Sequence, residues 1–184
     1  MYEVELKCRA DHDVLGERLD ARATRRGTVT QTDTYYNAPH RDFAETDEAV
    51  RVRVERERND EPIAKLTYKG PLLDADSKTR EEHETAVADE EAARGLLDGL
   101  GFEPAATVEK ERTAYALDGY TVTLDLVTGL GEFVEIETEV ETEAGIPDAR
   151  DGACDLLDEL GVDTDESIRT SYLGLLLATE RDVQ

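Results

Sequence analysis

Lysine is scarce in this chain of 184 residues, which contains five lysines among its 21 basic residues but 45 aspartates and glutamates. The net charge of −24 at pH 7 repels phosphate backbones and anionic lipid headgroups. Long hydrophobic runs are also missing, since no apolar run approaches the ~20 residues of a membrane-spanning helix. We therefore expect neither nucleic acid nor a membrane as a partner.

Cysteine is almost absent as well. Cys8 and Cys154 lie far apart, and their spacing matches no metal-binding motif. Two free thiols are typical of a reducing cytoplasm. The N-terminus begins with alternating charged residues and has no basic-then-apolar leader, so we expect no signal peptide and a cytoplasmic protein.

The excess of acid fits three classes of protein: a disordered chain, an acidic interaction protein, or a folded halophilic protein. Val, Ile and Leu recur with regular periods, which argues against disorder. We favour adaptation to salt, because at 1 M salt the Debye length falls to ~3 Å and a dense acidic surface becomes compatible with a compact fold. If so, structure should be lost in dilute buffer.

Eight segments have the alternation or the β-prone composition that is typical of strands. In the first, Val4 and Leu6 point one way, while Glu5 and Lys7 point the other way. The predicted strands span residues 2–9, 28–36, 49–57, 63–68, 78–87, 107–117, 121–127 and 132–142. No Ser/Gly-rich linker divides the chain, so we expect a single α+β domain over residues 1–184.

Four further segments are predicted to be helices, several of them with an acidic N-cap or a glycine at the end. The first runs from a cap at Asp11 or Asp13 to about Arg26 and ends at Gly27, and the others span residues 89–100, 148–160 and 166–178. Their apolar faces are expected to contain Val14, Leu15 and Leu19, then Leu96, Leu97 and Leu100, then Leu156, Leu157 and Leu160.

Charged side chains gather on the polar faces of these strands, and many of them are cations. The sets that share a face are Glu3, Glu5 and Lys7; Arg51 and Arg53; Lys65 and Lys69; Arg80, Glu82 and Glu84; Lys110 and Arg112; Thr121, Thr123 and Asp125; and Glu135 and Glu137. In a protein of this charge, the solvent face of an ordinary sheet should be acidic. The paired cations therefore need an explanation.

Two arrangements account for them. In one, cross-strand ion pairs decorate an exposed sheet and each adds a few tenths of a kcal/mol. In the other, which we favour slightly, about eight antiparallel strands close into a barrel with the polar faces inward and the helices outside. A lumen with many cations and some carboxylates suits a polyphosphate with a divalent metal ion.

The same residues carry a resemblance to a known family. Glu3-Val4-Glu5-Leu6-Lys7 resembles the N-terminal ExExK signature of the CYTH superfamily, the triphosphate tunnel metalloenzymes. Further matching segments follow in family order over nearly the whole chain: residues 33–36, 50–53, 65–71, 80–82, 109–112, 124–125, 129–137 and 171–173. The chain looks most similar to the class IV adenylate cyclase branch, although Asn37 stands where that branch usually has Asp.

The resemblance implies an eight-stranded antiparallel β-barrel with a charged lumen. It implies Mg²⁺ or Mn²⁺ as cofactor, with Glu3, Glu5, Asp125, Glu135 and Glu137 as metal ligands. The residues implied to bind triphosphate are Lys7, Arg51, Arg53, Lys65, Lys69, Arg80, Lys110 and Arg112, with Lys7, Arg53, Lys110 and Arg112 acting in catalysis.

The function implied first is conversion of ATP to 3′,5′-cyclic AMP and pyrophosphate. A hydrolase of inorganic or thiamine triphosphate is the alternative, and a polyphosphate- or nucleotide-binding module without turnover is another. The substrate partner would be ATP or another triphosphate, and the family suggests a homodimer. If the charged residues were only salt-adapted surface, Arg51→Ala and Lys65→Ala would change stability by under ~1 kcal/mol and affect no ligand.

Overall fold

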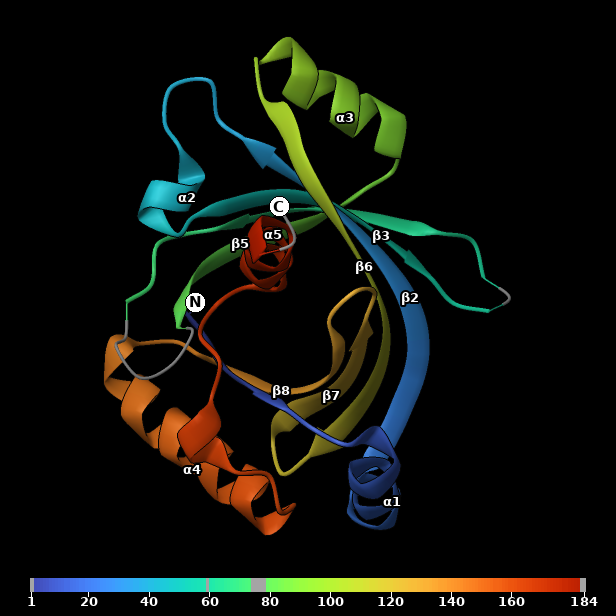
Figure 1. The fold of residues 1–184 in the computed structure, drawn as a ribbon, viewed down its shortest axis with the longest axis vertical. Coiled ribbons are helices and arrows are strands. Elements are labelled where there is room, and N and C mark those ends of the chain that lie inside the picture. The colour runs from blue at the N-terminus through green and yellow to red at the C-terminus, as the bar shows by residue number, and fades with distance from the viewer. Residues whose placement is uncertain (1, 59, 74–78, 183–184) are drawn as a thin grey trace.

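The computed structural model describes residues 2–58, 60–73 and 79–182. Its strands close into an antiparallel barrel in the order β1-β5-β4-β3-β2-β6-β7-β8, which confirms the predicted fold class (Figure 1). The strands are β1 (Tyr2–Arg9), β2 (Thr24–Asn37), β3 (Ala49–Arg56), β4 (Ile63–Lys69), β5 (Arg80–Val87), β6 (Glu103–Leu117), β7 (Tyr120–Val127) and β8 (Gly131–Val140).

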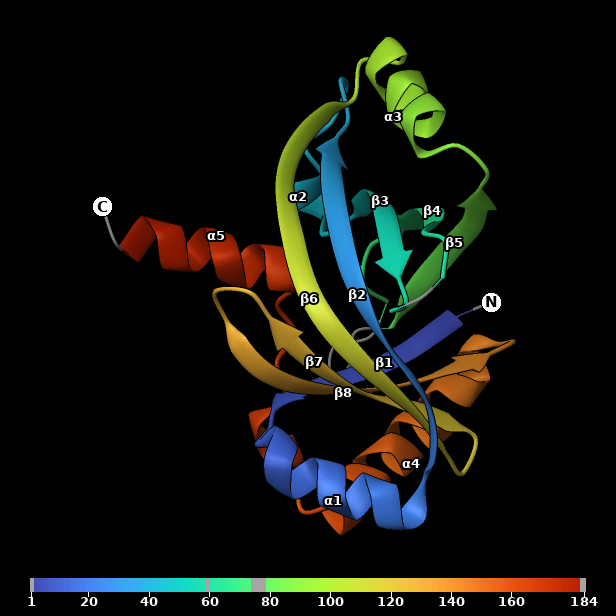
Figure 2. The same cartoon turned by 90° about the vertical axis from the view of Figure 1, so that its right-hand side faces the viewer.

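Helices cover the barrel wall and one of its ends. Their bounds are α1 (His12–Arg22), α2 (Phe43–Thr46), α3 (Glu90–Gly99), α4 (Ile146–Glu159) and α5 (Tyr172–Asp182), with 3₁₀ turns at Glu143–Gly145 and Thr164–Glu166. α1 and α4 lie against the outside, whereas α2 and α5 lie together at one end of the barrel, from which α5 projects (Figures 1 and 2). No helix in the described part of the chain is long and apolar enough to cross a membrane.

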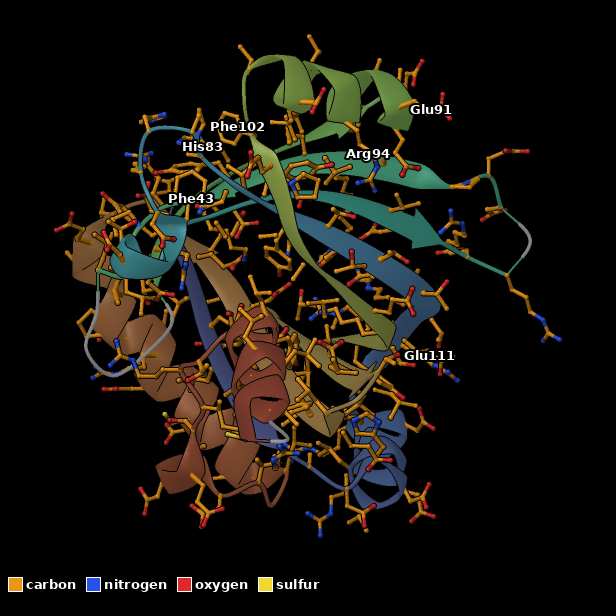
Figure 3. The ribbon with its side chains drawn as sticks, turned by 45° about the horizontal axis from the view of Figure 1, so that its top comes forward. Phe43, His83, Glu91, Arg94, Phe102 and Glu111 are labelled. Carbon is orange, nitrogen blue, oxygen red and sulfur yellow. The ribbon has the colours of Figure 1, made fainter. Side chains whose placement is uncertain are left out.

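The strand alternation sends apolar side chains outward, where the helices cover them. Leu6 and Cys8 of β1 form one core cluster with Leu15 and Leu19 of α1, and Leu157 of α4 completes it. α3 covers another part of the wall through Ala93 and Leu97, near the ring pair Phe43 and Phe102, whose centroids are 6.4 Å apart (Figure 3). The polar side chains are therefore directed into the lumen.

The end of the first helix was predicted wrongly. α1 has its N-cap at Asp11 but ends at Arg22 instead of Arg26. Residues 24–26 join β2 because this segment pairs with β6, where Arg25 lies opposite Tyr115. Gly27 does not end a helix: it has φ +152° at a register shift of β2, a backbone conformation for which glycine is suited.

The last helix and the apolar stripe of α3 also differ from the prediction. α5 begins at Tyr172, not near residue 166, because the preceding segment is extended and Ile168 N–H donates to the carbonyl of Lys7. In α3, Leu97 is buried, but Leu96 and Leu100 are 68% and 67% exposed, since only one narrow side of α3 contacts the barrel. Val14 of α1 is exposed too. The predicted strand start at residue 78 lies outside the described residues, and β5 begins at Arg80.

Candidate functional site: a cation-lined lumen

A cavity of about 840 Å³ occupies the inside of the barrel. β2 contributes alternate side chains along it, including Gln31, Asp33 and Tyr35. The predicted site residues that line this cavity are Glu3, Glu5, Arg51, Arg53, Lys65, Lys69, Arg80, Lys110, Arg112, Glu135 and Glu137. The ionic side chains therefore converge on an enclosed channel and do not decorate an exposed sheet.

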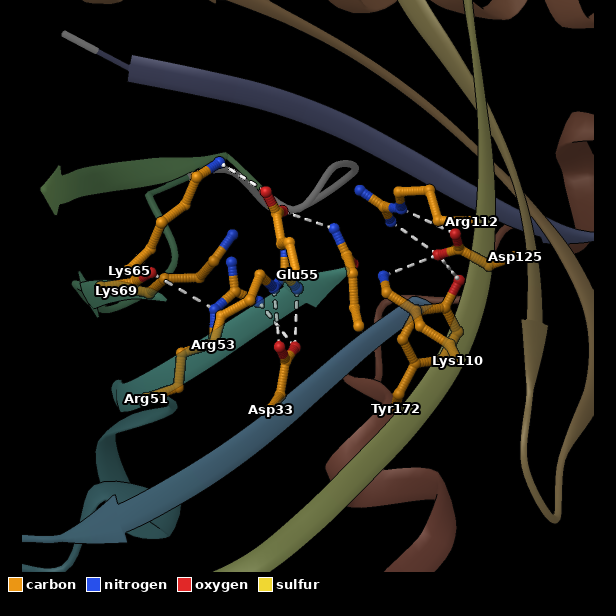
Figure 4. A network of polar contacts seen from close by, with 12 residues as sticks. Asp33, Arg51, Arg53, Glu55, Lys65, Lys69, Lys110, Arg112, Asp125 and Tyr172 are labelled. Carbon is orange, nitrogen blue, oxygen red and sulfur yellow. Dashed lines mark hydrogen bonds and ion pairs between the residues drawn. The ribbon is translucent and has the colours of Figure 1, made fainter. Parts of the chain in front are cut away.

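Asp33 holds two arginines of β3 at the centre of this cavity. Its two carboxylate oxygens accept from Nε and Nη2 of Arg53, each at 2.6 Å, and Arg51 Nη1 lies 3.3 Å away (Figure 4). Burial alone would raise the pKa of Asp33, but Arg51 and Arg53 outweigh burial and hold that pKa well below its usual range. The two guanidinium groups are thereby fixed side by side.

The lysines of β4 have acidic partners on the adjacent strands β3 and β5 and on β1, which lies beyond β5. Lys69 Nζ lies 2.9 Å from Glu3 and 2.5 Å from Glu82. Lys65 Nζ lies 3.1 Å from Glu55 and 3.3 Å from Glu84. Burial alone would raise the pKa of Glu3. The charge of Lys69 outweighs burial and lowers that pKa to about 2. Lys65 has a side chain 29% exposed, so it is accessible from the cavity.

A second buried carboxylate, Asp125 of β7, joins three side chains. It accepts from Lys110 Nζ at 2.8 Å, from Nε and Nη2 of Arg112 at 2.7 and 2.6 Å, and from the Tyr172 hydroxyl at 3.0 Å (Figure 4). Arg112 also donates to Glu135. Burial and the nearby charge of Arg112 lower the pKa of Lys110 to about 8. Asp125 is fully buried, and it fixes both cations of β6 in place.

Lys7 is buried on the same face of β1 as Glu3 and Glu5, and it holds the segment before α5. Its Nζ donates to the carbonyl of Thr170 and lies 4.3 Å from the centre of the Tyr172 ring. Lys110 Nζ lies 5.0 Å from the same ring. Lys7 and Asp125 are thus the two predicted site residues that sit outside the cavity lining and contact the residues that form it.

Arg80 lines the cavity, but its guanidinium group binds Asp47 and Gly70. One nitrogen donates to the carbonyls of Asp47, at 2.7 Å, and Gly70, at 3.3 Å, and the other lies 3.3 Å from the Asp47 carboxylate. Asp47 has a positive φ of 53°, an uncommon conformation for aspartate. Arg80 therefore ties the loop after α2 to the end of β4.

Carboxylates from β1 and β8 face one another, and a bound cation would offset their repulsion. Glu5 and Glu137 are directly opposite in the β1–β8 register, and like charges in such a pair repel. Burial raises the pKa of Glu137 to about 7, and the negative charges of Glu3 and Glu5 add to the shift.

The donor chemistry of this region fits a hard divalent ion such as Mg²⁺ or Mn²⁺, which prefers oxygen ligands. Next to these carboxylates the buried Thr123 Oγ1 has no hydrogen-bond partner among the described residues. No three His, Cys, Asp or Glu side chains of the described segments already converge into a coordination shell. The residues with suitable oxygens are Glu3, Glu5, Glu135, Glu137 and Thr123.

The sequence analysis gave no role to several residues that organise this cavity. Asp33 and Glu55 bind predicted cations through their carboxylates, and the ring of Tyr172 contacts Lys7 and Lys110. Asp33 belongs to the matching segment 33–36, and its phase with Gln31 in β2 places both on the polar face. In a chain with 45 acidic residues, one more carboxylate gives little signal.

Asn37 performs a structural role at the end of β2. Its Oδ1 accepts from the backbone N–H groups of Ala38, at 3.2 Å, and Phe43, at 3.0 Å. An aspartate could accept the same two bonds, so the departure from the class IV pattern leaves this loop intact.

Comparison with known proteins agrees with this architecture. The CYTH domain family model matches residues 1–172. The "Putative adenylate cyclase MJ0240" of Methanocaldococcus jannaschii is 37% identical over 145 residues, which are 79% of this chain and 80% of that protein.

Two solved structures share the barrel. The PH1819 protein from Pyrococcus horikoshii is 43% identical with a TM-score of 0.91, covering 96% of this chain and 99% of that one. HpAC1 from Hippeastrum, named an adenylyl cyclase and said to have a dominant triphosphatase activity, is 18% identical with a TM-score of 0.66, covering 97% and 95%. The family match, the closed barrel and the cations of its lumen together show that the chain belongs to the CYTH family.

Proposed function

We propose that this protein converts ATP to 3′,5′-cyclic AMP and pyrophosphate with the help of a divalent metal ion. The observation that carries the proposal is one cavity inside the barrel that is lined by Arg51, Arg53, Lys65, Lys69 and Arg112. Arginine and lysine in a partly water-excluded site bind phosphate oxygens strongly. The adenylate cyclase name of the Methanocaldococcus relative supports the same reaction.

The cations of β3 and β4 would hold the triphosphate. Asp33 keeps Arg51 and Arg53 parallel, which prepares two guanidinium groups for phosphate oxygens before any substrate enters. Lys65 and Lys69 each contact two carboxylates. Because the lysine and the carboxylates of each ion pair all line the cavity, phosphate oxygens would replace these carboxylate contacts at little cost in free energy.

In the reaction, the ribose 3′-oxygen attacks the α-phosphorus and the bond to the β-phosphate oxygen breaks. A divalent ion bound by the carboxylates of β1 and β8 would supply Lewis acidity that eases loss of the 3′-hydroxyl proton. Lys110 and Arg112 would stabilise the negative charge that develops on the departing pyrophosphate. Lys7 and Asp125 would act as positioning residues, because they contact Tyr172, Lys110 and Arg112.

Hydrolysis of a triphosphate is the second candidate, because the same cations and carboxylates would serve it. The triphosphatase activity given for the Hippeastrum protein makes this alternative concrete, although that protein shares only the fold with this chain.

Product analysis separates the candidates. The protein is incubated in molar salt with Mg²⁺ or Mn²⁺ and either ATP or inorganic triphosphate. Cyclic AMP and pyrophosphate in equal amounts are expected from ATP. Orthophosphate as the main product would contradict cyclisation and support hydrolysis. Binding of ATP without any product would support a module without turnover. Glu135→Gln should abolish product formation while ATP still binds.

A further inference from the structure

Gln31 of β2 lines the lumen with one of its two amide atoms unpaired. The residue is only 3% exposed. Its Nε2 donates to Glu55 Oε1 of β3 at 2.7 Å, whereas its buried Oε1 has no hydrogen-bond partner among the described residues. A buried amide oxygen without a partner costs about 1–3 kcal/mol, so such an atom in the wall of a cavity points to a ligand.

The orientation of this amide is fixed by its neighbour. The carboxylate of Glu55 accepts from the NH2 group of Gln31. Turning the amide over would set two oxygens against each other and would leave the NH2 group unpaired instead. The unpaired atom is therefore the oxygen, and the ligand that it binds must donate a hydrogen bond.

This acceptor lies next to the cations of the lumen. Glu55 Oε2 is 3.1 Å from Lys65 Nζ (Figure 4), and Arg53 is directly opposite Lys65 in the β3–β4 register. In the β2–β3 register Gln31 pairs with Glu55, and the next inward pair along the strands is Asp33 with Arg53. Two residues of a strand span about 7 Å. Gln31 and Glu55 therefore form the next layer of the lumen beyond Arg53.

This layer suits a hydroxyl group better than a phosphate group. Phosphate oxygens carry negative charge and only accept hydrogen bonds, so the Glu55 carboxylate repels them. A water molecule has two O–H groups, one for Gln31 Oε1 and one for Glu55. Because the amide of Gln31 is bonded to Glu55, both acceptors are within reach of a single water molecule. The lone pairs of that water then remain available.

We propose that Gln31 Oε1 and Glu55 bind the water molecule that hydrolyses a triphosphate, which gives the protein a hydrolytic activity besides cyclisation. The inference rests on the proposed function only in taking a triphosphate as the ligand of Arg53 and Lys65. The water oxygen attacks the phosphorus of the end phosphate from its outer side, in line with the bridging oxygen. The bond from phosphorus to that bridging oxygen breaks, pyrophosphate leaves with the electron pair, and Glu55 takes the proton of the water.

The test follows inorganic triphosphate, which has no ribose, in molar salt with Mg²⁺. The parent should release orthophosphate and pyrophosphate in equal amounts. In water labelled with a heavy oxygen isotope, the label should enter orthophosphate, because the water attacks an end phosphorus. Label in pyrophosphate would mean attack on the central phosphorus and would overturn the proposal, as would a parent that leaves triphosphate intact.

Two variants test the residues that bind the water. Gln31→Leu should lower kcat at least tenfold and keep the affinity for triphosphate within threefold. Glu55→Gln should lower kcat on the order of 100-fold, because the proton acceptor is lost. It should bind triphosphate as tightly as the parent or more tightly, since a negative charge beside the phosphate is removed. Thr32→Val is the matched control: Thr32 is next to Gln31 in β2 but lies outside the cavity lining, so hydrolysis should match the parent.

Unchanged hydrolysis in either Gln31→Leu or Glu55→Gln would overturn the proposal. A loss of affinity as large as the loss of rate would overturn it too, because that is the result of a purely structural role. Failure of the proposed function looks different. If ATP gives no cyclic AMP but hydrolysis of triphosphate responds to both variants as expected, the water site stands and cyclisation falls. If cyclic AMP forms and triphosphate stays intact, cyclisation stands and the water site falls.

Discussion

Asp33 is a buried carboxylate between two buried arginines, and its charge decides whether both can stay inside the lumen. Arg53 contacts it with two nitrogens at 2.6 Å each, which is the bidentate geometry of strong arginine–carboxylate pairs. Removing one partner of such a pair leaves an uncompensated buried charge. Asp33 therefore offsets part of the positive charge of both arginines.

Asp33→Asn should destabilise the fold by about 3–5 kcal/mol at pH 7, because Arg51 and Arg53 lose their shared counterion. Thermal unfolding in molar salt measures this, and inorganic triphosphate should restore part of the loss by binding the folded state. The pH dependence has a defined sign. The pKa of Asp33 is lowered on folding, so its contribution is present above pH ~4 and fades as pH falls through the lower folded pKa.

The difference in stability between the parent and Asp33→Asn should accordingly shrink below pH 4. A constant difference from pH 7 to pH 3 would contradict the assigned ion pair.

Tyr172 is the point at which the C-terminal segment meets the charged network. Tyr172→Phe keeps the ring that Lys7 and Lys110 contact but removes the hydroxyl that donates to Asp125. A hydrogen bond to a charged group contributes about 1.5–3 kcal/mol, so thermal unfolding should reveal a loss of that size. Tyr120→Phe, which loses a bond to the neutral carbonyl of Ala149, should cost less. Equal losses would argue against a special role for Asp125.

At the scale of the elements, the eight strands and the bounds of α3 were predictable from this sequence, but the end of α1, the start of α5 and the first four residues of β2 and of β6 were not. The period of two in β1, β3 and β8 is visible because the polar positions must face the lumen and the apolar ones must face the helices. The end of α1 depends on pairing between β2 and β6, and the start of α5 on contacts with β1. Such long-range pairing has no local signal.

The candidate site was predictable to a similar degree. Its cations were found because lysine is rare in this chain, so each lysine on a strand is informative. Asp33 and Glu55 were missed because acidic residues are common on every surface of an acidic protein. Tyr172 covers both Lys7 and Asp125, and this three-dimensional packing is encoded by no sequence period.

Replacing each of two helical glycines by alanine should change the stability of the fold in opposite directions. A Cβ at Gly152 of α4 would clash with the Tyr120 hydroxyl, which must then move and lose its bond to Ala149. We expect a loss of about 1–3 kcal/mol. A Cβ at Gly95 of α3 meets nothing within 4 Å, so Gly95→Ala should stabilise by about 0.5–1 kcal/mol through helix propensity. Chemical denaturation of both variants measures the pair, and the same sign for both would contradict this packing of α4.

The whole molecule combines a lumen in which cations are paired with carboxylates and a surface of high negative charge. With a net charge of −24, repulsion between exposed carboxylates opposes folding when salt does not screen it. The lumen pairs are shielded by burial and depend less on salt, so surface repulsion should dominate the response of the molecule to ionic strength.

Circular dichroism during a salt titration tests this at the scale of the molecule. Structure should be lost as NaCl falls from molar to about 10 mM, where the Debye length grows to ~30 Å. Inorganic triphosphate should delay the loss. An unchanged spectrum down to dilute buffer would refute adaptation to salt.

The most direct test of the central claim, that the inward cations form a triphosphate site, is a calorimetric titration with inorganic triphosphate and Mg²⁺ in molar salt. Lys65→Ala removes a lumen cation that is 29% exposed to the cavity, and Arg22→Ala removes one of an exposed pair outside the barrel. We expect Lys65→Ala to weaken binding at least tenfold, while Arg22→Ala binds like the parent. Equal affinities for the parent and both variants would contradict the account.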